Sequence, residues 1–69
     1  MAGRAALCER VVGRAEDAMR LDVVLSGWLG EPRARVQDRV ARGQVTVDGV
    51  TVAKSRRLRA GERVVVAQP

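Results

Sequence analysis

The stretch QVTVDGVTVA, residues 44–53, alternates apolar and polar residues on both sides of Asp48-Gly49. β-Branched valines at every second position favour strands that bury one face. Asp-Gly is a preferred pair for the two-residue type I′ turn that joins antiparallel strands. The stretch therefore predicts a β-hairpin, and it is the most specific local signal in the 69-residue chain.

The segment before the hairpin changes to helical spacing. Pro32 suits the first position of a helix, and Gly43 suits its end. Between them, Val36 and Val40 are four residues apart and are predicted to point inward.

This predicted helix also carries an arginine stripe. Arg35, Arg39 and Arg42 are spaced i, i+4 and i+7, and Arg33 extends the basic surface toward the start of the helix, while Asp38 falls off the stripe. A solvated helix face normally mixes both signs of charge. A stripe without an acid therefore favours a binding face.

A first helix is predicted over residues 21–29, with one apolar face. That face comprises Leu21, Val24, Leu25, Trp28 and Leu29. Asp22 suits the first turn because of the helix dipole, and Gly30 is a natural stop. Trp28 is interpreted as a core residue and not as a base-stacking platform.

The remaining segments complete an α+β fold. "RVVVA" (63–67) predicts a last strand with Val64 and Val66 on one side, and Leu58 anchors a basic loop over 54–62. The chain is predicted to pack two helices on a small, mostly antiparallel sheet made of the hairpin and the last strand. This domain would span 20–67.

The N-terminal extension over 1–19 is the least readable part, and we expect it to be partly mobile, above all residues 1–8. Residues 9–12 would allow a short strand, residues 13–17 are typical of a loop, and residues 5–7 would equally allow the start of a helix.

Composition excludes several classes of protein. Cys8 is the only cysteine and there is no histidine, so neither an intramolecular disulfide nor a zinc site is expected, and no cofactor is predicted. The apolar runs are too short for a membrane span or a signal-peptide core, so we expect a cytoplasmic location and no membrane partner.

The net charge of +5 is concentrated in the middle of the chain. Residues 31–59 hold seven arginines and one lysine against three acids, whereas the flanking segments are each neutral. A basic block inside a folded domain points to phosphate, and arginine suits bidentate phosphate contacts.

Four stretches together resemble a known family: "RLDVVL" (20–25), "RARVQDRVARGQVTVDG" (33–49), "AKS" (53–55) and "LRAGERVVV" (58–66). In order and spacing they are similar to the RNA-binding domain named after small-subunit ribosomal protein S-four. The resemblance covers about 20–66 and implies RNA contact through the second helix and the hairpin edge.

The resemblance implies a set of RNA-contacting residues. They are Arg20, Arg33, Arg35, Arg39, Asp48, Gly49, Lys54 and Arg56, to which charge and spacing add Arg42 and Arg57. The sequence departs from the family in two places. Glu31-Pro32 stands where the family usually has a capping serine, and Asp48 stands where asparagine is common, which places a negative charge beside a phosphate surface.

We therefore expect an RNA-binding module that docks on structured RNA, in particular ribosomal RNA, with no small-molecule substrate. Phosphate contacts would dominate its affinity, and RNA shape would supply selectivity. About five neutralised phosphates predict that log K falls with log salt with a slope of roughly −3.5 to −4.5.

One alternative concerns catalysis. Within the family the chain looks most like the N-terminal domain of large-subunit-RNA pseudouridine synthases, whose catalytic segment resembles His-Arg-Leu-Asp-x-x-Thr-Ser-Gly. Residues 19–27 here read MRLDVVLSG. A nucleophilic Asp22 would need a flipped base in a closed pocket, which 69 residues cannot enclose together with a core.

The helix interpretation is therefore favoured, with Asp22 as a helix-start residue and Ser26 as an ordinary exposed position. The chain would be no enzyme by itself. The alternative is the substrate-guiding domain of a truncated synthase, inactive alone, and the reading frame after Pro69 would discriminate the two.

Two further alternatives stay open. The second helix could enter the major groove of DNA, because residues 30–32 are compatible with a helix-turn-helix connection. The arginine face could instead dock on an acidic protein. Competition between a hairpin RNA and duplex DNA would separate the nucleic-acid hypotheses.

Overall fold

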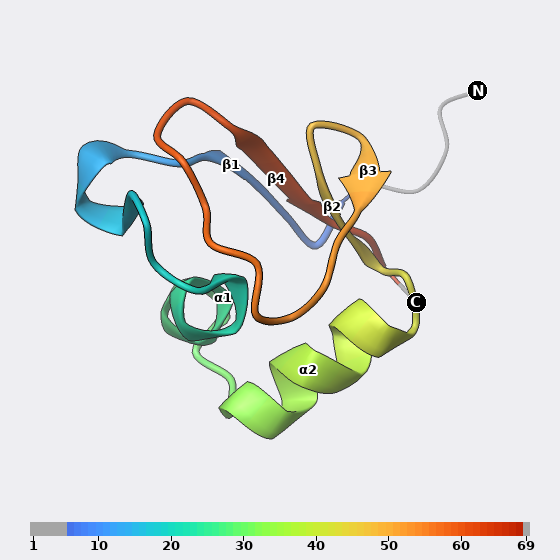
Figure 1. Ribbon diagram of the computed structural model, residues 1–69. Helices are drawn as coiled ribbons and strands as arrows, with labels where there is room; N and C mark the ends of the chain where they lie inside the picture. The colour runs from blue at the N-terminus through green and yellow to red at the C-terminus, as the bar shows by residue number, and fades with distance from the viewer. Residues whose placement is uncertain (1–5, 69) are drawn as a thin grey trace.

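The computed structural model describes residues 6–68, which form two helices on one side of a four-stranded sheet (Figure 1). In chain order the elements are β1 (Cys8–Val11), a 3-10 turn η1 (Arg14–Glu16), α1 (Leu21–Leu29), α2 (Arg33–Ala41), β2 (Val45–Val47), β3 (Val50–Thr51) and β4 (Arg63–Val66). The sheet is antiparallel in the order β1-β4-β2-β3. The predicted α+β class is confirmed.

The β2–β3 hairpin is confirmed at the predicted turn. Asp48 and Gly49 both have positive φ, 50° and 83°, as a type I′ turn requires. β2 also pairs with β4, so that Val45 faces Val66 and Val47 faces Val64. These valines are 0–3% exposed and form the sheet side of the core, as the alternation predicted.

The sheet extends to the N-terminal segment. β1 pairs with β4 from Cys8 opposite Val66 to Val11 opposite Arg63, and Val12 is buried. The possible strand over 9–12 is thus present, displaced by one residue, and the expected loop over 13–17 contains η1. The folded unit includes residues before Arg20. Residues 1–5 of the expected mobile extension lie outside the described residues.

The helices match their predicted bounds closely. α1 spans the predicted residues, buries Leu21, Val24 and Leu25, and ends at Gly30 with φ 66°. α2 begins one residue later than expected, because Pro32 has extended backbone (ψ 150°) and occupies the N-cap. Val36 on α2 is buried, as its position on the inward face predicted.

Trp28 lies half-buried against the core. The guanidinium of Arg10 covers its ring at 4.7 Å from the centroid, a cation–π contact that shields the ring from solvent. The interpretation of Trp28 as a packing residue is therefore supported.

The basic loop between β3 and β4 is held against the start of α1. The backbone N–H groups of Leu21 and Asp22 donate to the carbonyls of Arg56 and Lys54, at 2.9 and 3.2 Å. Leu58 is fully buried and anchors the loop to the core, as expected. The first N–H groups of α1 are therefore satisfied by loop carbonyls, and this fixes the backbone of the loop at Lys54 and Arg56.

Candidate nucleic-acid interface

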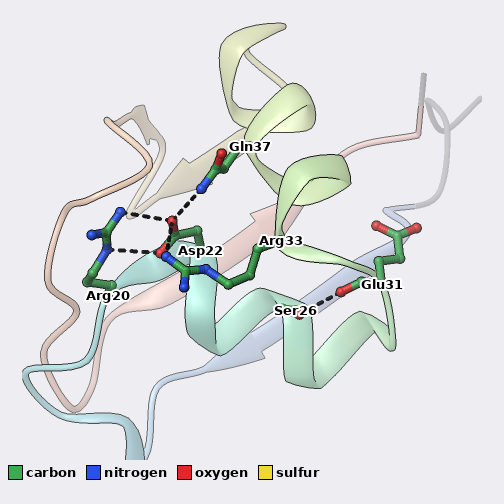
Figure 2. A network of polar contacts seen from close by, with 6 residues as sticks. All are labelled: Arg20, Asp22, Ser26, Glu31, Arg33 and Gln37. Carbon is green, nitrogen blue, oxygen red and sulfur yellow. Dashed lines mark hydrogen bonds and ion pairs between the residues drawn. The ribbon is translucent and has the colours of Figure 1, made fainter.

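Asp22 connects α1, α2 and the segment before α1 through its carboxylate (Figure 2). Arg20 donates to both oxygens, from Nε at 3.1 Å and from Nη2 at 3.0 Å. Arg33 and Gln37 of α2 donate to Oδ2 at 3.3 and 2.9 Å. The Asp22 side chain is 0% exposed, whereas those of Arg20 and Arg33 are 36% and 52% exposed.

The hydrogen bonds keep this buried carboxylate ionised. Burial alone would raise the pKa of Asp22, but the donors Gln37, Arg20 and Arg33 outweigh it and lower the pKa to about 2. Arg20 and Arg33 use only some of their N–H groups on Asp22 and hold the others at the surface. Asp22 thereby orients two guanidinium groups that remain able to bind an anion.

Asp22 lies in the first turn of α1, as expected, but it is the buried centre of a network. A nucleophile must be reached by its substrate, and this carboxylate is inaccessible and already accepts four hydrogen bonds. The geometry supports the structural interpretation of Asp22 over the catalytic one.

The loop after β3 adds three cations beside this network. Lys54 is exposed, and Arg57 donates to the carbonyl of Ala18 at 3.0 Å. Arg56 pairs with Glu62 at 2.6 Å, and this hydrogen bond lowers the pKa of Glu62 to about 2. We call the set Arg20, Arg33, Lys54, Arg56 and Arg57 the helix–loop surface.

The helix–loop surface keeps an excess of positive charge. Its five cations form ion pairs with two carboxylates, Asp22 and Glu62, so three positive charges exceed the paired negative ones. Besides the hydrogen bond to Glu62, the charge of Asp48 also acts on Arg56 and helps to raise its pKa. Within the described residues 6–68, neither Lys54 nor Arg57 forms an ion pair. This surface therefore has the electrostatic character that phosphate binding needs.

The predicted arginine stripe forms a separate group, Arg35, Arg39 and Arg42, which we call the distal flank of α2. Arg39 is 16% exposed and pairs with Glu31 at 2.7 Å, and Arg42 pairs with Asp38 at 2.9 Å. The hydrogen bond from Arg39 lowers the pKa of Glu31. The stripe positions themselves hold no acid, but two of their arginines are nevertheless paired, because Glu31 before α2 and Asp38, one turn before Arg42, both supply carboxylates.

The helix–loop surface and the distal flank point in different directions. Arg33 and Arg35 are two residues apart on α2, and about 100° per residue turns their side chains roughly 160° away from each other. Arg33 reaches Asp22 on one side, whereas Arg35 lies with Arg39, Arg42 and Gln44 around a separate hollow. The predicted α2 arginines are therefore divided between two sides of the helix.

The hairpin turn lies away from α2, at the opposite end of β2 (Figure 1). The Oδ1 atom of Asp48 accepts the N–H of Arg63 at 2.9 Å, which ties the turn to β4. The structure does not bring Asp48 and Gly49 together with the cations of α2. Their observed role is to form the turn.

The sequence does not predict two contacts, those of Ser26 with Glu31 and of Gln37 with Asp22. Ser26 is half-buried, and its hydroxyl donates to the carbonyl of Glu31 at 2.5 Å, so the expectation of an ordinary exposed position is wrong. The sequence pattern assigns no role to Gln37, although it follows Arg33 by four residues and shares its face. The four-residue spacing of Arg33 and Gln37 can be seen in the sequence. The buried carboxylate of Asp22, to which both side chains donate, cannot.

Other kinds of site find no support among residues 6–68. No group of three or more His, Cys, Asp or Glu side chains is placed to hold a metal ion. Neither helix has the length and apolar character needed to cross a bilayer.

A comparison with protein families matches residues 19–64 to the model described as S4 domain. This match covers both helices, the hairpin and the start of β4. No curated protein and no solved structure matches the chain.

Proposed function

The chain belongs to the S4 domain family, a family of general RNA-binding modules, and from this premise we propose that it docks on structured RNA, in particular ribosomal RNA, through the helix–loop surface. The distal flank of α2 would extend the contact, chiefly through Arg35. The match of residues 19–64 to the S4 domain model confirms the resemblance to this family that the sequence motifs indicate.

The observation that carries the proposal is the Asp22 network. A phosphate-binding arginine loses side-chain entropy on binding unless it is already ordered. Here Arg20 and Arg33 are ordered by one buried carboxylate, and hydrogen bonds to the backbone of α1 hold the chain at Lys54 beside them. Two pre-ordered guanidinium groups, with the backbone of Lys54 fixed beside them, suit a folded RNA backbone, whose phosphates have a defined spacing.

A salt titration tests this proposal. Counting the three excess positive charges and Arg35, about four phosphates would be neutralised, so log K should fall with log salt with a slope of roughly −2.8 to −3.6. The measurement is fluorescence anisotropy with a labelled hairpin RNA, with duplex DNA of matched length as competitor. A slope near zero, or tighter binding to the DNA, would contradict the proposal.

The identity of the RNA needs a separate experiment. Crosslinking in cells followed by sequencing should recover ribosomal RNA, at sites near helix junctions or hairpins. Recovery of messenger RNA alone would contradict the ribosomal part of the proposal and leave RNA binding intact.

The sequence-based alternative of a guiding domain for pseudouridine formation would use the same surface. The inaccessible Asp22 gives no support to chemistry at the MRLDVVLSG segment itself. Incubation of the chain with uridine-containing hairpin RNA should therefore leave the uridines unmodified.

A further inference from the structure

A shallow groove of about 350 Å³ lies between α2 and the segment that follows β3. Gln37, Val40 and Ala41 line it from α2, and Val52, Ala53 and Lys54 line it from the other side. Four of the six lining residues are apolar, and both walls are anchored, since Val40 and Val52 pack against the core. The groove is therefore an apolar depression with defined walls.

The groove adjoins the helix–loop surface through two shared residues. Lys54 lines the groove and belongs to that surface, and its carbonyl accepts the N–H of Asp22. Gln37 lines the groove and donates to Asp22 at 2.9 Å. A polynucleotide whose phosphates lie on Arg33 and Lys54 would thus pass the mouth of this apolar depression.

The orientation of the Gln37 amide follows from the charge on Asp22. An ionised carboxylate only accepts hydrogen bonds, so Gln37 must present its NH₂ group to it. Figure 2 shows the amide oxygen turned away from Asp22. Among residues 6–68 no hydrogen bond reaches this oxygen, and no side-chain polar atom without a partner is buried. Oε1 is therefore accessible to an incoming donor.

These features match the chemistry of an unpaired nucleobase. A base has apolar faces that stack on apolar side chains and an edge of N–H donors and ring acceptors. The valines and alanines would contact a face, Oε1 of Gln37 would accept from the edge, and the Lys54 ammonium would bind an edge acceptor or the adjoining phosphate. A paired base inside an RNA helix cannot enter, because its faces are covered by its neighbours.

We propose that the groove between α2 and residues 52–54 receives one unpaired base of the bound RNA, so that the chain selects RNA with a bulged or looped-out nucleotide next to a helix. This inference rests on the proposed RNA docking and adds the class of RNA that the surface selects. It also explains how a surface of phosphate contacts, which reads no sequence, gains selectivity.

Three hairpin RNAs that share one stem test the proposal against the full chain. The first is fully paired, the second has a single bulged adenosine, and the third has an abasic nucleotide at the bulge, which keeps the extra phosphate and removes the base. We expect the bulged adenosine to bind roughly tenfold more tightly than the paired stem, because one face of the base is buried against the valines and alanines. The abasic bulge should bind like the paired stem.

Leucine substitutions that fill the groove without changing charge provide the matched variants. Ala41→Leu and Ala53→Leu are at exposed lining positions and should reduce the tenfold preference to about one, with the salt slope unchanged. Ala34→Leu, seven residues earlier on the same helix and outside the groove lining, should keep the preference. Urea unfolding of each variant verifies that it is folded.

The outcomes separate this inference from the proposed function. Equal binding of the bulged and abasic RNAs, or a preference that survives both groove substitutions, overturns the base site and leaves RNA docking intact; in the second case the bulged base binds outside the groove. Absence of binding to all three RNAs, with the expected salt slope missing, overturns both.

Discussion

The amide nitrogen of Gln37 lies 2.9 Å from Oδ2 of Asp22, so one hydrogen bond joins the middle of α2 to the first turn of α1. The same oxygen also accepts from Arg33 and from Nη2 of Arg20, and the other oxygen accepts from Nε of Arg20. Asp22 is therefore at once a packing element between helices and the residue that orients the cations of the candidate interface.

Neutralising Asp22 should destabilise the chain. In Asp22→Asn an NH₂ group replaces one acceptor oxygen and faces donors, while the arginines lose their counter-charge. We expect the free energy of unfolding, measured by urea denaturation, to fall by about 1–3 kcal/mol. The matched control is Asp38→Asn, because Asp38 forms a pair with Arg42 in which both side chains are more than 60% exposed, and it should change stability by less than about 0.5 kcal/mol. Equal effects of the two substitutions would contradict the structural role of Asp22.

Acid should destabilise the fold through Asp22 and Glu62. Their folded-state pKa values of about 2 lie below the ordinary values of 3.8 and 4.5. A carboxyl group whose pKa is lowered by folding stabilises the folded state. This contribution to the free energy of unfolding is fully present when the pH is above the ordinary pKa, and it is lost as the pH falls through the folded-state pKa. Stability should therefore be constant above about pH 5 and decline from there to about pH 2.

The Asp22→Asn variant isolates one part of that decline. Between about pH 5 and pH 2, the wild-type chain should lose about 2 kcal/mol more unfolding free energy than the variant, which has no carboxylate at this position. Urea midpoints measured across the range check this. Parallel pH profiles for the two proteins would show that Asp22 does not have a lowered pKa.

The helix–loop surface and the distal flank of α2 should differ in RNA binding. Lys54→Gln removes an exposed cation without an ion pair among the described residues, so the salt slope should become shallower by roughly 0.7–0.9. Arg42→Gln removes a cation already paired with Asp38 and should leave the slope nearly unchanged. The reverse result in the anisotropy titration would place the RNA on the distal flank.

Two glycine-to-alanine substitutions should have opposite effects on stability. Gly49 has φ 83° in the hairpin turn, where alanine is strained, so Gly49→Ala should cost about 1–2 kcal/mol. Gly27 lies exposed inside α1 with no atom within 4 Å of an added Cβ, so Gly27→Ala should stabilise by about 0.5–1 kcal/mol. Thermal or urea unfolding measures the change in stability of each variant. A stabilised Gly49→Ala or a destabilised Gly27→Ala would contradict the prediction.

The sequence by itself determined the elements that depend on local spacing. Valines at period 2 around Asp48-Gly49 specify the hairpin, and the apolar face of residues 21–29 specifies α1, because both depend on backbone geometry within about ten residues. The RNA-binding family could also be inferred, because its motifs are short stretches in a characteristic order.

Only the tertiary structure decided which charges are available. Whether Arg39 is free depends on Glu31, eight residues away, and the role of Asp22 depends on Gln37, fifteen residues away. The pairing of β1 with β4 joins residues more than fifty positions apart. Burial and ion pairing arise from where distant segments meet, and helical spacing in a sequence shows which residues share a face but not which partners that face will find.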